Sequence, residues 1–342
     1  MAYTTVPKSS DYFLTKLWTG NNTGQTINGI PFAPHFVWIK NRSASESHTL
    51  VDAVRGANNF IKSNDTSVNN TNTEFVKSLT SDGYTLGNAD EVNNGSNNIV
   101  GWNWKANGQG SSNTAGSINT TYTSANTTSG VSIVKWNGNG STATIGHGLG
   151  KVPKMIIVKS LANTTTWMVQ HASLGNAKEI YLNNTTAAGN STAWNSTTPT
   201  STVFSVTGGG GDGVNASGAY IAYCFADIQG FSKMGFYDGN GSAEGVFEYL
   251  GFKPAFLLIK NTTATEAWFL YDSKRGYNGS MGALFPDEAA AEASANNIDL
   301  LSNGFKLRTG GAILNGNTTR YIYMALAESP LVSTNNVAAT AR

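Results

Sequence analysis

The chain has 342 residues, a formal net charge of +1 and only 13% charged residues. This balanced charge argues against nucleic acid or an anionic membrane surface as a partner. A single cysteine, Cys224, excludes an internal disulfide framework. No window approaches the roughly 18 consecutive apolar residues of a membrane span. The 38 glycines, with many Asn, Thr and Ser residues, are typical of short strands joined by turns, so we expect an all-β protein.

One sequence pattern occurs three times. In its clearest copy, residues 234–260, an aromatic strand meets a Gly-Asn-Gly turn at 239–241, and a proline then opens an apolar strand that a lysine closes. The lysine follows the proline by six residues in every copy, at Pro34 and Lys40, Pro153 and Lys159, and Pro254 and Lys260. A period of about 100 residues is the length of one sandwich domain, so we expect three tandem homologous β-sandwich-like domains.

The expected organisation follows from this period. The boundaries we expect are an N-terminal arm at 1–12, a first repeat at 13–108, a linker rich in Gly, Ser, Asn and Thr at 109–130, a second repeat at 131–230, a third at 231–330, and a C-terminal tail at 331–342. The stretch at 35–39 is almost continuously apolar, which predicts a strand buried on both faces. One segment, 287–295, is a helix candidate, because Asp287 can cap a first turn that carries Glu288.

Polar residues also recur at fixed distances from the repeat proline. Eighteen residues after it stand Asp52, His171 and Asp272, and three residues further on stand Arg55, Leu174 and Arg275. One interpretation is a polar binding site on each repeat. The other, which we favour, is an Asp–Arg pair that pins a loop, since exposed ion pairs are common and weak. Equivalent residues in separate domains would also lie too far apart to act on one substrate.

Other motifs indicate neither an enzyme nor a cofactor site. The four histidines form no spaced ligand pair, so we expect no metal. The glycine-rich loop at 146–150 precedes a strand rather than a helix, unlike a phosphate loop. No Gly-x-Ser-x-Gly elbow is present, so a serine hydrolase has no anchor. The recurrent lysines are expected at strand ends, with their stems along a sheet edge that they keep from pairing with other chains.

Exposed aromatic rings are the remaining candidates for ligand binding. An aromatic face matches the apolar face of a pyranose, so an exposed ring could stack on a sugar. Most of the eight tryptophans fall in strand positions and are expected in the core. Trp194 stands in a polar stretch, 192–196, and is therefore the best candidate for an exposed aromatic.

Several segments carry a family resemblance. They are the opening Met-Ala-Tyr-Thr-Thr at 1–5 with Lys-Ser-Ser-Asp at 8–11, Val-Trp-Ile-Lys-Asn at 37–41, Gly-Phe-Ser-Lys at 230–233, Tyr-Asp-Gly-Asn-Gly at 237–241, Ser-Asn-Gly-Phe-Lys-Leu at 302–307 and the ending Ala-Ala-Thr-Ala-Arg at 338–342. They resemble a family of marine bacteriophage virion structural proteins, of the tail-fibre, head-fibre or capsid-decoration type. The resemblance covers essentially the whole chain and implies no catalytic residues.

These observations lead to two functional hypotheses. The first is a non-enzymatic virion protein, a capsid decoration, head fibre or tail fibre that binds other capsid or tail proteins. The N-terminus lacks a secretion signal, so the protein is expected to assemble in the host cytoplasm and to leave as part of the particle. We expect self-association, with a trimer favoured, although three domains in one chain could instead mimic threefold symmetry as a monomer. The alternative is a glycan-binding tail-tip module that recognises the host surface, or, least favoured, a glycan hydrolase.

Overall fold

The computed structural model describes residues 3–208, 213–330 and 332. Its strands pair antiparallel throughout the named sheets, and its helices are single short turns. The expected all-β class is therefore confirmed. The tail expected at 331–342 lies outside the described residues apart from Val332.

Three main sheets form the framework of the fold. The first has the order β1 (Phe13–Thr19), β9 (Asn98–Trp104), β3 (Phe36–Asn41), β4 (Thr49–Asp52), β5 (Asn59–Ile61) and β6 (Asn70–Thr71). The second has the order β10 (Tyr122–Asn126), β11 (Val131–Gly138), β18 (Gly218–Phe225), β13 (Met155–Ser160), β14 (Met168–His171), β15 (Lys178–Tyr181) and β16 (Gly189–Asn190). The third has the order β19 (Ser232–Asp238), β27 (Arg320–Pro330), β21 (Phe252–Asn261) and β22 (Trp268–Asp272). The four-strand order β1-β9-β3-β4 thus recurs as β11-β18-β13-β14 and as β19-β27-β21-β22.

Smaller elements complete each of the three lobes. A small sheet faces each main sheet: β2 (Gln25–Ile27), β8 (Tyr84–Leu86) and β7 (Val76–Leu79) in the first lobe, β12 (Ala143–Gly146) and β17 (Val203–Val206) in the second, and β20 (Phe247–Tyr249), β26 (Gly304–Leu307) and β25 (Ile298–Leu301) in the third. The third lobe also has the hairpin β23 (Met281–Ala283) and β24 (Ala293–Ala295). The described helices are η1 (Ser9–Asp11), η2 (Ala172–Leu174), α1 (Asp90–Asn93) and α2 (Ala312–Asn315).

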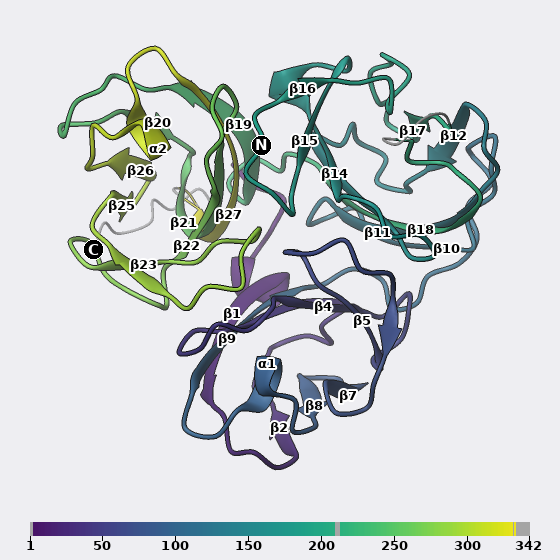
Figure 1. The fold of residues 1–342 in the computed structure, drawn as a ribbon, viewed down its shortest axis with the longest axis horizontal. Helices are drawn as coiled ribbons and strands as arrows, with labels where there is room; N and C mark the ends of the chain where they lie inside the picture. Colours follow the sequence, from purple (N-terminus) through teal and green to yellow (C-terminus); the bar gives the residue numbers. More distant parts are fainter. Residues whose placement is uncertain (1–2, 209–212, 331, 333–342) are drawn as a thin grey trace.

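The three lobes surround a common centre (Figure 1). The first lobe is drawn in purple and blue, the second in teal and the third in green and yellow, and each small sheet lies on the outer side of its lobe. Strand β3 shows why both faces of a main sheet are buried. Its residues Phe36 and Trp38 join the central core, while Val37 and Ile39 join the outer core of the first lobe. This alternation confirms the expected double-sided burial for residues 36–39, whereas His35 precedes the strand and is half-buried.

The central core is built by aromatic rings from all three main sheets. Phe36 of the first sheet stacks on Tyr223 of the second, with ring centres 4.2 Å apart. Trp104 of the first sheet packs edge-on against Phe256 of the third at 5.6 Å. Because this core crosses the expected boundaries, the division into three separate tandem domains remains a prediction.

The linker and the helix predicted from the sequence both differ in the structure. The linker expected at 109–130 contains β10, which pairs with the free edge of β11. The helix expected at 287–295 is absent, and its last residues instead form β24. Tertiary contacts override the helix signal there, because Asp287 accepts the Trp268 N–H at 3.0 Å and the Glu292 N–H donates to the Arg42 carbonyl at 2.9 Å.

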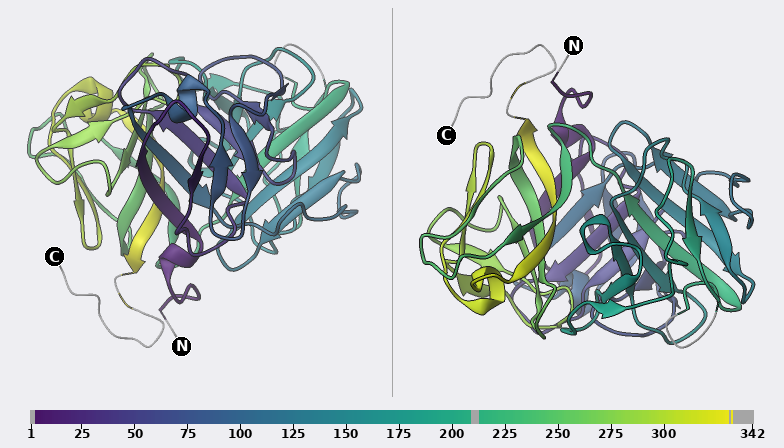
Figure 2. Two further views of the ribbon diagram at one scale, coloured as in Figure 1. Left: turned by 90° about the horizontal axis from the view of Figure 1, so that it is seen from below. Right: turned by 90° about the horizontal axis from the view of Figure 1, so that it is seen from above.

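The N-terminal arm expected at 1–12 packs on the protein where it is described. Val6 is buried, and the Tyr3 hydroxyl donates to the Gly251 carbonyl at 3.0 Å. Helix η1 lies beside the end of β27, so both ends of the described chain run along the same end of the molecule (Figure 2).

Candidate functional site

The recurrent Asp and Arg residues form buried ion pairs at the ends of two strands. Asp52 ends β4, and its Oδ2 lies 2.6 Å from Arg55 Nε, while its Oδ1 accepts the Arg55 backbone N–H at 2.8 Å. Asp272 ends β22 and binds Arg275 in the same way, at 2.5 and 3.1 Å. This is the geometry of a carboxylate that pins a loop. We expected exposed pairs, but both pairs are buried, since no side chain among them is more than 2% exposed.

Each carboxylate also binds the central strand of a neighbouring main sheet. Asp52 Oδ2 accepts the hydroxyl of Tyr223, on β18 of the second sheet, at 2.8 Å. Asp272 Oδ2 accepts the indole N–H of Trp102, on β9 of the first sheet, at 2.9 Å. The sequence spacing identified the carboxylates but could not show these partners, which lie 171 and 170 residues away.

His171 completes this set in the second sheet. Its Nδ1 accepts the Ser173 N–H at 3.2 Å, so Nε2 carries the proton and donates to the Tyr323 carbonyl of β27 at 3.1 Å. Burial lowers the pKa of His171 to about 4, which keeps the ring neutral. The first sheet therefore binds the second, the second binds the third, and the third binds the first.

A second closed set of bonds runs the other way around the centre. It uses the ring N–H groups that stand fourteen residues after the repeat proline. The bonds are His48 Nε2 to the Phe285 carbonyl at 3.0 Å, Trp167 Nε1 to the Lys62 carbonyl at 2.9 Å, and Trp268 Nε1 to the Tyr181 carbonyl at 2.8 Å. Sequence reasoning missed this set. The available signal was three N–H-bearing rings at one distance from the proline.

The recurrent lysines contradict the expected edge role. Lys40, Lys159 and Lys260 are fully buried, and their strands β3, β13 and β21 lie inside the main sheets. Their amines bind backbone carbonyls, and two reach a neighbouring lobe: Lys159 Nζ lies 3.1 Å from the Thr66 oxygen and Lys260 Nζ 3.0 Å from the Thr185 oxygen. Burial lowers the pKa of each of the three amines to about 8. Lys159 and Lys260 thus join lobes, and Lys40 binds the Asn41 and Ala44 carbonyls of its own lobe.

Trp194 also contradicts its expected exposure. It is 0% exposed and packs in the outer core of the second lobe. The residues that made the stretch look polar, Asn195 and Ser196, are exposed and turn the chain with positive φ values of 51° and 47°. The turn directs the polar groups outward and leaves the indole inside, so Trp194 offers no surface to a sugar.

The Gly-Asn-Gly turns at 138–140 and 239–241, and the Gly-Asn-Asn turn at 20–22, are held by buried asparagines that the sequence did not reveal. Asn93, Asn215 and Asn315 are buried and donate their side-chain amides to the turn residues Asn21, Asn139 and Asn240, at 3.0, 2.9 and 2.8 Å. The turn glycine allows this close packing. A Cβ on Gly138 would collide with the Ala216 carbonyl, so only glycine fits there.

Other kinds of site were sought in the part of the chain that the structure describes. No group of three or more His, Cys, Asp or Glu side chains there could hold a metal ion. Across residues 3–208 and 213–330, no helix is long and apolar enough to cross a membrane.

The fold and these contacts define a class: an all-β protein in which three main sheets close around one aromatic core. The family model for a domain of unknown function, DUF7483, matches residues 8–330. The chain thus belongs to the DUF7483 family. No curated protein and no solved structure matches it. The description of the family states no activity, so the functional argument depends on the residues themselves.

Proposed function

We propose that the chain is a non-enzymatic structural protein of a bacteriophage particle, either a capsid decoration or head fibre, or a tail fibre. It would act by assembling with capsid or tail proteins on the particle surface. The observation that carries the proposal is the pair of closed bond sets around the centre, in which the recurrent polar residues bind neighbouring sheets. The recurrent positions of the three copies bind the lobes of the chain to one another. The family resemblance of the sequence and its low charge agree with this role.

The two recurrent carboxylates support a structural role over sugar cleavage. Asp52 and Asp272 are 0% exposed, and each binds an arginine and a neighbouring aromatic donor. A glycosidase needs one carboxyl group to protonate the leaving oxygen and a second to act on the sugar ring. Carboxylates enclosed in this way are not free for either task, so we do not propose hydrolysis.

The arrangement of the lobes bears on the oligomeric state. Three similar sheets already surround one centre within a single chain (Figure 1). This supports the monomer that mimics threefold symmetry over the trimer that we favoured from sequence. A native mass near 36.1 kDa in solution would agree with the monomer, and a mass about three times larger would support the trimer.

The glycan-binding alternative loses its first candidate, because Trp194 is buried. What favours it is a different feature, an open pocket in the third lobe beside an exposed tyrosine. That pocket would give the protein a ligand in addition to its structural role, and it is developed below.

Immunogold electron microscopy of purified particles tests the main proposal. Label spread over the head would support a decoration or head fibre, and label confined to the tail would support a tail fibre. Antibody absorbed beforehand with the purified protein provides the matched control. No label on any part of the particle would contradict the proposal.

A further inference from the structure

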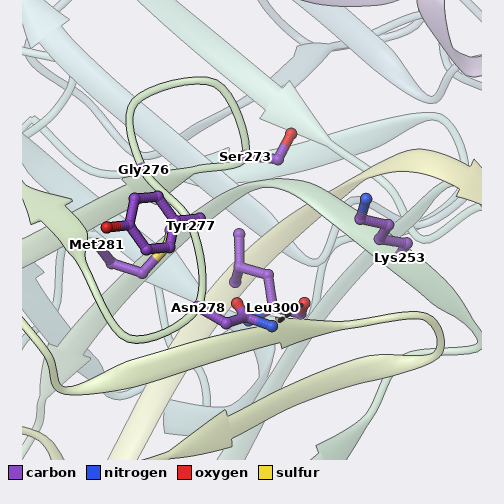
Figure 3. Close-up of a pocket in the computed structure, with 7 residues that line it drawn as sticks. All are labelled: Lys253, Ser273, Gly276, Tyr277, Asn278, Met281 and Leu300. Atoms are coloured by element: carbon purple, nitrogen blue, oxygen red, sulfur yellow. Dashed lines mark hydrogen bonds between the residues drawn. The ribbon is translucent and has the colours of Figure 1, made fainter. Parts of the chain in front are cut away.

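A pocket opens in the third lobe where the loop after β22 meets β25 (Figure 3). Its volume is about 410 Å³, and its lining includes Lys253, Ser273, Tyr277, Asn278 and Leu300. Pockets that hold small ligands span about 300–1,000 Å³, so this one is large enough.

Tyr277 dominates the mouth of the pocket. It is 74% exposed, which makes it the most exposed large hydrophobic side chain among the described residues. The loop around it is tightly folded, because the Ser280 N–H donates to the Tyr277 carbonyl at 2.8 Å and Gly276 leaves no space for a Cβ against Met281. An exposed ring on a fixed loop is a ready platform for a flat apolar face.

The wall opposite this loop is held in place by hydrogen bonds. Asn278 Nδ2 donates to the Leu300 carbonyl at 3.1 Å, and the Leu300 N–H donates to Asn278 Oδ1 at 2.8 Å. These two bonds fasten the loop to β25. Preorganisation of this kind lowers the entropic cost of binding a ligand.

The remaining lining residues offer hydrogen-bonding groups. Lys253 Nζ lies 3.0 Å from Glu328 Oε2, and an ammonium has three donors, so this ion pair leaves donors available. The Ser273 hydroxyl is buried and has no hydrogen-bond partner among the residues that the structure describes. Glu328 lies 3.0 Å from Lys253 and 3.6 Å from Lys274, so one carboxylate faces two ammonium groups, and the donors that remain can bond the hydroxyl groups of a ligand.

The second lobe has a pocket at the equivalent place, where Val152, Ala172 and Asn176 stand instead of Lys253, Ser273 and Tyr277. That pocket has a volume of about 210 Å³ and includes Gly175 and Asn176, which match Gly276 and Tyr277. Asn176 is bound by Gln170 and Thr198 at 3.2 and 2.7 Å. A recurrent hollow is therefore present in both lobes, and the third lobe adds an aromatic platform to it.

We propose that the third-lobe pocket binds a saccharide, with the apolar face of a pyranose stacked on Tyr277 and its hydroxyl groups bonded to Lys253 and Ser273. An aromatic face with adjacent donors and acceptors is the combination that recognises a sugar ring. Binding here concerns the purified protein alone, so it holds or fails independently of where the protein sits on a particle.

Saturation-transfer NMR on the full chain tests this site directly. The probes are the methyl glycosides of glucose, galactose, mannose and N-acetylglucosamine. We expect transfer to the ring C–H protons of at least one glycoside, and a titration then gives its affinity. Tyr277→Ala should weaken that affinity roughly tenfold or more, while Tyr277→Phe, which keeps the ring, should retain most of it.

Two controls separate the site from general effects. Asn176→Ala alters the equivalent pocket of the second lobe and should leave binding unchanged. The thermal melting of Tyr277→Ala should match that of the wild type, because the side chain is largely exposed. No transfer to any of the four glycosides, or equal transfer in wild type and Tyr277→Ala, would overturn the proposal.

Discussion

The loops that follow β4 and β22 hold a charged pair, whereas the loop that follows β14 holds a neutral histidine at the same position. Asp52 and Asp272 accept hydrogen bonds from Tyr223 and Trp102 of the next sheet, and His171 donates to the Tyr323 carbonyl. We call each of these contacts between neighbouring main sheets a joint. The side chain at the recurrent position is a hydrogen-bond acceptor in two joints and a donor in the third. What the three copies share is the position of the joint and not its chemistry.

The neighbouring strand explains this reversal. Trp102, Tyr223 and Met324 occupy one register position, opposite Trp38, Ile157 and Leu258. A carboxylate only accepts, so it needs a neighbour that donates, and Trp102 and Tyr223 both do. Met324 has no N–H or O–H in its side chain, so the second sheet binds a backbone carbonyl through a histidine N–H instead. In each joint, a hydrogen-bond donor on one sheet therefore faces an acceptor on the other.

Removal of a carboxylate should have the largest effect, and it should differ between the two charged joints. Asp52→Asn leaves the buried Arg55 with neutral described partners such as Asn69 and the Leu50 carbonyl. Loss of one partner of a buried ion pair costs about 3–5 kcal/mol, and we expect this range in urea unfolding. Asp272→Asn should cost less, because Arg275 keeps Glu292 at 2.9 Å.

The exposed Asp82 offers a matched control, and Asp82→Asn should change the free energy of unfolding by no more than about 0.5 kcal/mol. Equal losses of unfolding free energy for Asp52→Asn and Asp272→Asn would contradict the predicted difference between the two charged joints.

The neutral joint should make the stability of the protein sensitive to acid. The pKa of His171 is about 4 in the folded state against an ordinary value of 6.5, so the folded protein binds fewer protons between these values. The stabilisation is complete above about pH 6.5 and is lost as the pH falls through 4, a change of about 3 kcal/mol. The pKa values of the buried His48 and His147 are lowered in the same direction.

Unfolding of wild type and His171→Gln at pH 7 and pH 5 isolates this contribution. The difference in unfolding free energy between pH 7 and pH 5 should be smaller in the variant than in the wild type, because glutamine does not titrate. An unchanged difference between the two pH values would mean that burial does not hold His171 neutral.

The donor side of a charged joint can be removed without a cavity. Tyr223→Phe deletes the hydroxyl that reaches Asp52 and Arg55, at 2.8 and 3.2 Å. Hydrogen bonds to charged groups contribute about 1.5–3 kcal/mol, so we expect a loss of about 2 kcal/mol in chemical denaturation. Tyr277→Phe, on an exposed loop, should change stability little. Equal stability of Tyr223→Phe and wild type would exclude the proposed role of this hydroxyl.

The smallest expected effect concerns the second partner of Arg275. Glu292 lies 2.6 Å from Arg42 and 2.9 Å from Arg275, and it joins the first and third lobes. In a double-mutant cycle, Asp272→Asn combined with Glu292→Gln should cost about 1 kcal/mol more than the sum of the single changes, because only the double variant leaves Arg275 without a carboxylate. Additive costs would show that Glu292 does not compensate for Asp272.

The sequence predicted those features that depend on local spacing. The repeat period located the central strands β3, β13 and β21, and the three-residue step from Asp52 to Arg55 indicated a pinned loop. Both signals depend on the spacing of residues along the sequence, and the folded protein has both features. The all-β class followed from composition for the same reason, since turns and short strands are local structures.

The predictions that failed concern features that depend on contacts between distant segments. Trp194 looked exposed because its neighbours are polar, but burial is set by the packing of the whole lobe. Lys40 looked like an edge residue because strand order within a sheet cannot be read from spacing. The helix candidate at 287–295 had good local propensity, and ion pairs of Glu292 with Arg42 and Arg275 hold that segment in another form.

The central claim is that the three lobes depend on one shared core and on the closed bond sets around it. Differential scanning calorimetry of the full chain tests this claim most directly. We predict a single unfolding transition whose calorimetric enthalpy equals the van't Hoff enthalpy, because no lobe keeps its core when another unfolds. Two or three resolved transitions, each with the enthalpy of about a hundred residues, would contradict the account and show independent domains.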